Sequence, residues 1–344
     1  MMANKPVILT GLRANNDLTL GNYFGGLLPI IDMAKNKSDE YQINLFVPDL
    51  HSFTTPIDHG DLQKQIWNNL RLFVAAGLPL DNEDVHLYRQ SYVPAHSEMT
   101  WILDCFTGMG EMGRMTEFKD KSSKVGEDRV SVGLYNYPVL MASDILLYGA
   151  SYVPVGDDQS QHLEFTRDIA QRMNSKLGEL FTVPKAVSEQ HEFFGKDQGL
   201  RIKDLADPTK KMSKSDESGK GVIFLSEDPE FAAGKIMRAT TDDLASIKYD
   251  PQNQHGISNL IEILALTAGK TKDEVVNEWQ GKTSYGEFKQ AVADAIRTFL
   301  TDFQAKLAQV DDAVLNAKLE ASERAMKEMA NQTLHNVQKA VGLR

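Results

Sequence analysis

The run Val7-Ile8-Leu9-Thr10-Gly11 decides the fold expected for this chain. Four mostly apolar residues that end at a glycine predict a short buried strand. A loop follows at 12–17, glycines recur within 18–26, and residues 27–33 are apolar at helical spacing. A strand, a loop and a helix that opens with glycines let backbone amides approach a nucleotide at the helix N-terminus. Because such turns are common in proteins without that role, the run alone indicates a fold rather than a function.

The same alternation of strands and helices continues through the first half of the chain. Residues 43–47 and 85–88 predict two more strands, and the apolar spacing within 62–74 predicts a helix between them. Strands that alternate with helices favour a parallel sheet with right-handed crossovers. His51 follows the second strand, at the edge where open parallel sheets bind ligands. The expected class is therefore α/β, with a Rossmann-like parallel sheet.

The composition is that of an ordinary globular protein of 344 residues, with 42% hydrophobic and 25% charged residues. A formal net charge of −11 argues against general nucleic-acid or membrane-surface binding and leaves room for a local basic track. The single cysteine, Cys105, excludes an internal disulfide and favours a reducing compartment. The N-terminal residues carry no apolar signal segment, and no stretch reaches the ~18 apolar residues of a membrane span. We expect a cytoplasmic protein that spans no membrane.

A second informative run, Lys211-Met212-Ser213-Lys214-Ser215, lies far downstream. The Asp-Pro before it and the Ser and Gly residues after it predict a loop. Two ammonium groups and two hydroxyl groups on a loop can close over a polyphosphate and neutralise charge as a bond to phosphorus breaks. A solvated basic turn is the alternative that this composition allows.

The run at 211–215 is, letter for letter, the second signature of the class I aminoacyl-tRNA synthetases, and the chain resembles this family. Thr-Leu-Gly-Asn at 19–22 is similar to the degenerate first signature, usually His-Ile-Gly-His, of the bacterial tryptophanyl branch. The chain departs from that branch at 14–16, where Ala-Asn-Asn replaces the usual Pro-Ser/Thr-Gly. The resemblance runs from about residue 11 to residue 342.

Residues 137–148 predict a largely buried helix that carries one carboxylate, Asp144. A lone buried carboxylate is costly unless a donor meets it. That donor is either a neighbouring cation of the protein or a bound ligand. The resemblance implies the ligand, because the matching aspartate of the tryptophanyl branch accepts the indole N–H and the residue matching Met141 lines the ring.

The resemblance implies three sets of site residues. The expected tryptophan site comprises Leu9, His51, Tyr137, Met141, Asp144, Val153, Val155 and Gln159. The expected ATP site comprises Arg13, Ala14, Asn15, Gly21, Asn22, Gly156, Asp157, Asp158, Ile202, Lys211, Met212, Ser213, Lys214 and Ser215. The expected catalytic residues, which stabilise the departing pyrophosphate, are Lys121, Lys211 and Lys214. Mg²⁺ is expected on ATP, without protein ligands.

The resemblance also implies the activity and the domains. L-tryptophan would be activated with ATP and transferred to the 3′ end of tRNA(Trp), by a homodimer. Residues 1–205 would form the catalytic domain, 206–220 a mobile loop, and 221–344 an α-helical anticodon-binding domain whose last helix packs back on the catalytic domain. The helical signals there are Asp228-Pro229, a helix start at Ser258, a capping box at Thr271, and apolar stripes within 288–303 and 315–341. The candidates for a basic tRNA track are Arg114, Lys119, Lys327 and Lys339.

Two other readings stay open at this level. One is the same chemistry with tyrosine as the amino acid, which the surroundings of Asp144 would discriminate. The other is a non-catalytic paralogue that binds tRNA or a small ligand; the intact run at 211–215 argues against it, and Ala-Asn-Asn at 14–16 leaves room for it. A small-molecule adenylyltransferase would share the sheet and the first signature but would not need the long helical C-terminal region.

Overall fold

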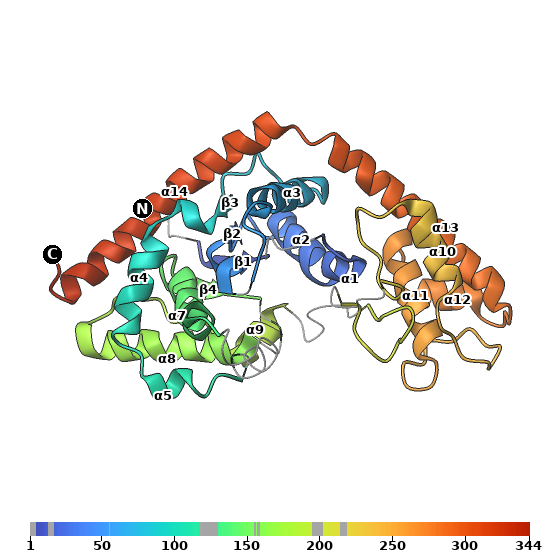
Figure 1. Cartoon of the computed structure of the whole chain (residues 1–344), viewed down its shortest axis with the longest axis horizontal. Helices are drawn as coiled ribbons and strands as arrows, with labels where there is room; N and C mark the ends of the chain where they lie inside the picture. The colour runs from blue at the N-terminus through green and yellow to red at the C-terminus, as the bar shows by residue number, and fades with distance from the viewer. Residues whose placement is uncertain are drawn as a thin grey trace. The chain divides into compact units, whose positions relative to one another are not determined.

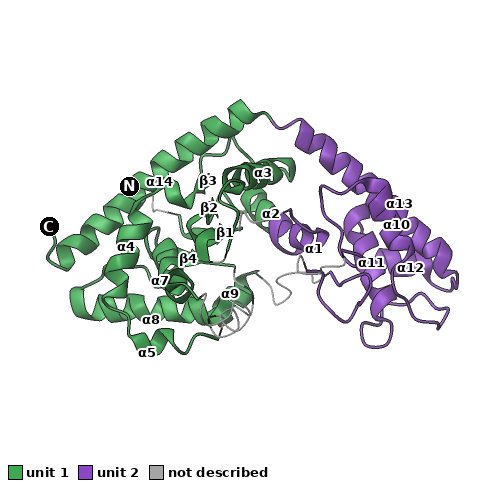
Figure 2. Cartoon of the chain, viewed as in Figure 1, with its two compact units in different colours: residues 1–15, 30–198, 311–344 green, residues 16–29, 199–310 purple. Residues whose placement is uncertain are grey.

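The computed structural model describes residues 5–12, 17–54, 56–116, 118, 130–154, 156, 159–194, 202–213 and 219–344. The chain divides into two compact units (Figure 2). Residues 1–15, 30–198 and 311–344 form the first, which we call the sheet unit, and residues 16–29 and 199–310 form the second, the helical unit. The functional domain boundaries expected at 205 and 220 stay a prediction.

The sheet unit is built on parallel strands. Those within the described residues are β1 (Val7–Gly11), β2 (Gln42–Val47), β3 (Val85–Arg89) and β4 (Ala150–Tyr152), in the spatial order β3-β2-β1-β4. All three pairings are parallel, with Val7 opposite Gln42 and Ile43 opposite Val85. This arrangement confirms the α/β class and the three strands expected in the first half of the chain.

Helices pack on the sheet because its strands are apolar on both faces. The helices that follow in the chain are α2 (Leu28–Asn36), α3 (Leu62–Ala75), α4 (Ala95–Asp104), α5 (Met109–Met112), α7 (Val132–Leu146), α8 (Ser160–Leu177), α9 (Val187–Phe194) and α14 (Asp312–Ala340). Two short 3₁₀ turns, η2 (Leu50–Thr54) and η3 (Gln90–Tyr92), follow β2 and β3. One continuous core joins Leu9 and Tyr88 of the sheet to α4, α7, α8 and the apolar stripe of α14. Figure 1 shows α14 running along the β3 side of the sheet. Of the described helices, none is long and apolar enough to cross a membrane.

The helical unit contains α1 (Leu20–Asn22), the π-helical turn η1 (Tyr23–Leu27), α10 (Pro229–Met237), α11 (His255–Ala268), α12 (Lys272–Trp279) and α13 (Tyr285–Ala308). Its long helix α13 packs against α10 and α11, and buries the expected apolar stripe. Two predicted caps are confirmed. The Asp228 carboxylate accepts from the Phe231 N–H with Pro229 in the first turn, and Thr271 forms a capping box with Glu274.

One local expectation is wrong. The helix expected to start at Ser258 starts at His255, because the Ser258 hydroxyl is used instead to accept from the Asp250 N–H. Residues 222–225 form no ladder, only a single bridge between Phe224 and Thr19. The strand β4 ends at Tyr152, and the next amide, Val153 N–H, donates to the Gln190 side chain.

Candidate active site

Asp144 lies in the second half of α7, within the core. The helix begins at Val132, after the N-cap Ser131, whose hydroxyl accepts from the Leu134 N–H, and it buries most of its length. The Asp144 side chain is 2% exposed. A carboxylate at that depth requires hydrogen-bond donors from other elements, because ionised groups are very rarely buried alone.

Three donors meet Asp144, one from each of three elements. His51 Nε2, in η2, is 2.8 Å from Oδ2. Gln90 Nε2, in η3, donates to Oδ1 over 2.7 Å, and His96 Nδ1, in α4, is 2.6 Å from the same oxygen. All four side chains are buried, so these bonds are shielded from water.

These donors set the ionisation of Asp144. Burial by itself raises the pKa of Asp144, but the hydrogen bonds that His51 and His96 donate to it outweigh burial and hold the pKa below its ordinary value. The group is therefore a carboxylate at neutral pH, and the imidazole nitrogens facing it donate. A carboxylate has about four acceptor positions, two on each oxygen. The described residues fill both positions of Oδ1 and one of Oδ2, which leaves one acceptor position on Oδ2.

The other residues of the expected tryptophan site that the structure describes come from β1, α7 and the segment after β4. Leu9 is buried in β1, and Met141 is partly buried in α7, packed against the core. Tyr137 lies in α7 near His51, with ring centroids 6.2 Å apart, and its hydroxyl bonds His162 Nε2 over 2.9 Å. Val153 is buried, and Gln159 caps the start of α8. Val155 lies outside the described residues.

The first signature, at 19–22, is a capping box in the helical unit. The Thr19 hydroxyl accepts from the Asn22 N–H over 3.1 Å, and the Asn22 side chain accepts from the Thr19 N–H over 3.2 Å. A Cβ added at Gly21 would lie 3.7 Å from Met212 Cβ and 3.8 Å from Ile202 Cβ. The structure thus brings together three of the residues expected around ATP, Gly21, Ile202 and Met212, although two of them are about 190 positions downstream.

The second signature begins on a hairpin of the helical unit. The Met212 N–H donates to the Ile202 carbonyl over 3.0 Å, and the Asp204 N–H donates to the Lys210 carbonyl over 3.0 Å. Asp207 closes the turn between these segments by an ion pair with Lys210 at 2.8 Å. Lys211 and Ser213 are exposed, as groups that bind a phosphate need to be.

The hydrogen bonds from Lys210 and Thr209 lower the pKa of Asp207 to about 2, so the ion pair that closes the turn persists at neutral pH.

The structure does not test all of the expected ATP residues. Gly156 is exposed, just before α8. The expected residues that lie outside the described part of the chain are Arg13, Ala14, Asn15, Lys121, Asp157, Asp158, Lys214 and Ser215.

Sequence reasoning missed Gln90 and His96. A signal for them existed, because Gln90 directly follows β3 and His96 opens the next helix. The carboxyl ends of adjacent parallel strands meet at one edge of the sheet. The rule that predicts His51 after β2 as a site residue applies equally to the residues after β3.

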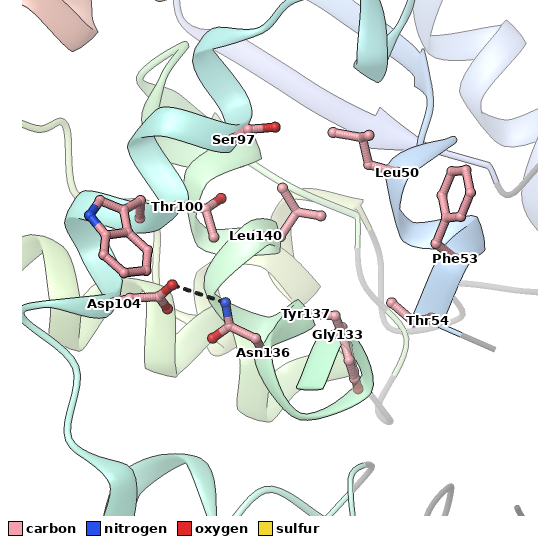
Figure 3. Close-up of a pocket in the computed structure, with 11 residues that line it drawn as sticks. Leu50, Phe53, Thr54, Ser97, Thr100, Asp104, Gly133, Asn136, Tyr137 and Leu140 are labelled. Atoms are coloured by element: carbon pink, nitrogen blue, oxygen red, sulfur yellow. Dashed lines mark hydrogen bonds between the residues drawn. The ribbon is translucent and has the colours of Figure 1, made fainter. Parts of the chain in front are cut away.

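A pocket of about 370 Å³ lies between η2, α4 and α7 (Figure 3). Apolar side chains line most of it, including Leu50, Phe53 and Leu140, and Tyr137 is the residue of the expected tryptophan site among its lining. Its polar end is the pair in which the Asn136 amide donates to Asp104 over 3.0 Å. Burial raises the pKa of Asp104, against the opposing effect of that hydrogen bond.

The fold and these two clusters define the class of protein. Residues 2–301 match the family described as tRNA synthetases class I (W and Y). The chain belongs to this family of class I aminoacyl-tRNA synthetases.

Several relatives within the family are tryptophan enzymes. The chain is 41% identical over 338 residues to the tryptophan–tRNA ligase of Corynebacterium glutamicum, covering 97% of this chain and 94% of that protein. It is 41% identical to that of Caldanaerobacter subterraneus, with 98% of each covered. The tryptophanyl-tRNA synthetase of Mycoplasma pneumoniae superposes with a TM-score of 0.82 at 32% identity, over 99% and 98% of the two chains. The tryptophanyl-tRNA synthetase of Campylobacter jejuni, complexed with ADP and tryptophan, superposes with a TM-score of 0.80 at 28% identity, and the match covers 98% of this chain and 100% of that chain.

Proposed function

We propose that the chain is a tryptophan–tRNA ligase. It activates L-tryptophan with ATP to tryptophanyl-adenylate and pyrophosphate, then transfers the amino acid to the 3′ end of tRNA(Trp). The observation that carries tryptophan over tyrosine is the buried Asp144 carboxylate with one acceptor position left. An indole N–H only donates, whereas a phenol hydroxyl also accepts. The donors around Asp144 already point at its carboxylate.

The activation step requires placement more than acid–base chemistry. The carboxylate of tryptophan is ionised at pH 7, so it attacks the α-phosphorus of ATP without a general base. Its oxygen forms the new bond to phosphorus as the bond to pyrophosphate breaks. Holding both substrates in line can lower the barrier by roughly 7–11 kcal/mol.

The second requirement is to stabilise the negative charge on the departing pyrophosphate. Lys121, Lys211 and Lys214 are the residues we assign to it, with backbone groups at Gly21 and Asn22 beside the nucleotide. Lys211 is an exposed cation, and the exposed Ser213 hydroxyl by itself is a weaker ligand for Mg²⁺ than the phosphate oxygens of ATP. Mg²⁺ would therefore arrive on the phosphate oxygens of ATP and add neutralising charge there. The tryptophanyl group then passes to the 2′-hydroxyl of the terminal ribose, as is usual for class I.

We assign the helical region beyond residue 220 to the tRNA anticodon. Arg114, Lys327 and Lys339 are exposed and fit a local basic track on an acidic protein; Lys119, the fourth candidate, lies outside the described residues. The single cysteine fits a reducing cytoplasm, where we place the enzyme.

We also propose a homodimer. Large apolar side chains are exposed at the pocket of Figure 3, where Phe53 and Trp101 are 52% and 72% exposed. At a second pocket, Met109 and Val132 are 75% and 81% exposed. The two pockets share Asp104 and Asn136, and large apolar side chains that are exposed close together are typical of a protein interface. Sedimentation equilibrium of the chain and of Trp101→Asp tests this proposal. We expect a dimer that Trp101→Asp weakens, and a monomeric wild type would refute it.

An exchange assay tests the main proposal. ATP–pyrophosphate exchange is measured with each of the twenty amino acids, and then charging of tRNA(Trp) transcript with the preferred one. We expect exchange with tryptophan to exceed that with tyrosine and phenylalanine by several orders of magnitude. Exchange that prefers tyrosine, or exchange with no amino acid, would reject the assignment.

A further inference from the structure

The two oxygens of Asp144 have different surroundings. Oδ1 accepts from both Gln90 and His96, which fill its acceptor positions. Oδ2 accepts from His51 alone among the described residues. Gln90 and His96 are both 0% exposed, whereas His51 is 7% exposed and lies beside Tyr137. Oδ1 is therefore held by the protein, and Oδ2 carries the acceptor position that remains.

Each of the two donors to Oδ1 is itself fixed in orientation. The Gln90 side chain accepts from the Leu50 N–H through Oε1 over 3.1 Å, so its amide has one arrangement that satisfies both ends. His96 uses Nδ1 for Asp144 and Nε2 for the Tyr148 hydroxyl, 2.8 Å away. Burial raises the pKa of Tyr148, so the phenol keeps its proton and can donate it to Nε2. This hydrogen bond selects the His96 tautomer with hydrogen on Nδ1.

Aromatic rings hold the His96 imidazole in place. Its ring lies nearly parallel to that of Tyr88, at 6.4 Å between centroids, and 5.6 Å from that of Tyr148. The Ser143 hydroxyl donates to the backbone carbonyl of His96 over 2.9 Å, which ties α4 to the residue before Asp144.

We propose that His96 and Gln90 are positioning residues for substrate selection: they orient Asp144 so that Oδ2 meets the indole N–H. This inference rests on the proposed function and adds the groups that act through Asp144. Neither residue needs to contact tryptophan. Removing the His96 donor frees the carboxylate to turn about its Cβ–Cγ bond, and the acceptor position on Oδ2 is no longer fixed.

The test compares two ligands that differ at one atom. β-(Benzothiophen-3-yl)alanine keeps the shape of tryptophan and replaces the N–H by sulfur. Kd values for both ligands are measured by calorimetry on the full chain. Wild type should prefer tryptophan by about 10–100-fold, the range for one hydrogen bond to a charged group. His96→Leu and Gln90→Leu should each reduce this preference by about 10-fold.

Conservative variants separate positioning from stability. The amide of His96→Asn can donate to Oδ1 as Nδ1 does, so its preference should stay within about threefold of wild type. Tyr148→Phe keeps the ring and removes the hydroxyl that fixes the tautomer, and its preference should fall even if His96→Leu does not fold. Thr166→Val removes a fully buried hydroxyl bonded to the His162 carbonyl, and should leave the ligand preference unchanged.

The outcomes distinguish this inference from the proposed function. If Asp144→Ala leaves the preference intact, the tryptophan assignment fails. If Asp144→Ala abolishes the preference while His96→Leu, Gln90→Leu and Tyr148→Phe retain it, the assignment stands and the positioning role is refuted. Lower melting temperatures with an unchanged preference would assign these residues to stability alone.

Discussion

The guanidinium of Arg89 and the carboxylate of Glu323 form a two-point ion pair between β3 and α14. Nε lies 2.6 Å from Oε1, and Nη2 lies 2.9 Å from Oε2. The two side chains are 11% and 10% exposed. Two residues earlier in β3, the Leu87 N–H donates to the Ser322 hydroxyl over 3.2 Å. Since β3 is the edge of the described sheet, α14 supplies acceptors to amides that would otherwise be unpaired there.

Breaking this ion pair should destabilise the chain strongly. Glu323→Ala leaves a largely buried guanidinium without its partner, which costs about 3–5 kcal/mol. Replacing both residues, Arg89→Met with Glu323→Leu, removes the uncompensated charge and should recover most of that loss. Urea denaturation of the two variants measures the free energies of unfolding. A single variant as stable as wild type would show that the pair contributes little.

Asp144→Ala should affect both selectivity and stability. The variant loses the acceptor for the indole N–H and leaves three buried donors unpaired. Phenylalanine lacks both the N–H and the second ring of tryptophan, so the wild type should reject it by about 10⁴–10⁵ in kcat/KM, and Asp144→Ala should lose much of this discrimination. The KM for tryptophan should rise while that for ATP stays near normal. A folded Asp144→Ala enzyme that still rejects phenylalanine contradicts the assignment.

Lys211→Ala should lower the rate of adenylate formation. Its proposed role lies in the transition state, so kcat of exchange should fall by about 10²–10³ while the KM for tryptophan changes little. Lys214→Ala should behave in the same way. The matched control is Lys210→Ala, the adjacent lysine, which is paired with Asp207 and 76% exposed. If Lys210→Ala and Lys211→Ala have equal effects, the loss reflects loop charge and not a specific role.

Acid should destabilise the fold through His86. Burial, with Lys318 nearby, lowers the pKa of His86 to about 4, against a weaker raising effect of Asp84. Between pH 6.5 and about 4 the unfolded chain binds a proton that the folded chain does not, so stability is full above pH 6.5 and falls as the pH drops. The loss reaches about 3 kcal/mol at about pH 4. His86→Gln should lose less stability than wild type between pH 7.5 and 4.5 in urea titrations. Equal pH slopes would contradict this account.

Salt should weaken tRNA charging much more than it weakens ATP–pyrophosphate exchange. The net charge of −11 means that tRNA must bind on a local basic track, and its phosphate contacts release counterions. Charging at subsaturating tRNA should therefore fall steeply from 50 to 200 mM salt (about 10³-fold for six phosphate contacts), while exchange without tRNA falls far less. Lys327→Glu and Lys339→Glu should weaken charging alone. Equal salt sensitivity of both assays would exclude the track.

The sequence by itself determined the elements whose signals are local. The strand at Val7–Gly11 follows from its short run of apolar residues. The caps at Asp228 and Thr271 follow from side chains that bond backbone N–H groups within four residues of themselves. The two signature runs identified the family for the same reason, because each is contiguous. The helix expected to start at Ser258 is present but begins three residues earlier, and the Ser258 hydroxyl accepts from the Asp250 N–H, which lies outside the helix.

Only the tertiary structure decided what Asp144 contacts. Its partners are 93, 54 and 48 positions away, and no local pattern sets which of them reaches which oxygen. The same holds for Arg89 and Glu323, 234 positions apart. The packing of whole helices on the sheet fixes such pairs, because a buried charge is tolerated only where that packing also delivers its partners. The sequence therefore indicated a costly carboxylate in α7, and the fold determined which of its oxygens the protein holds.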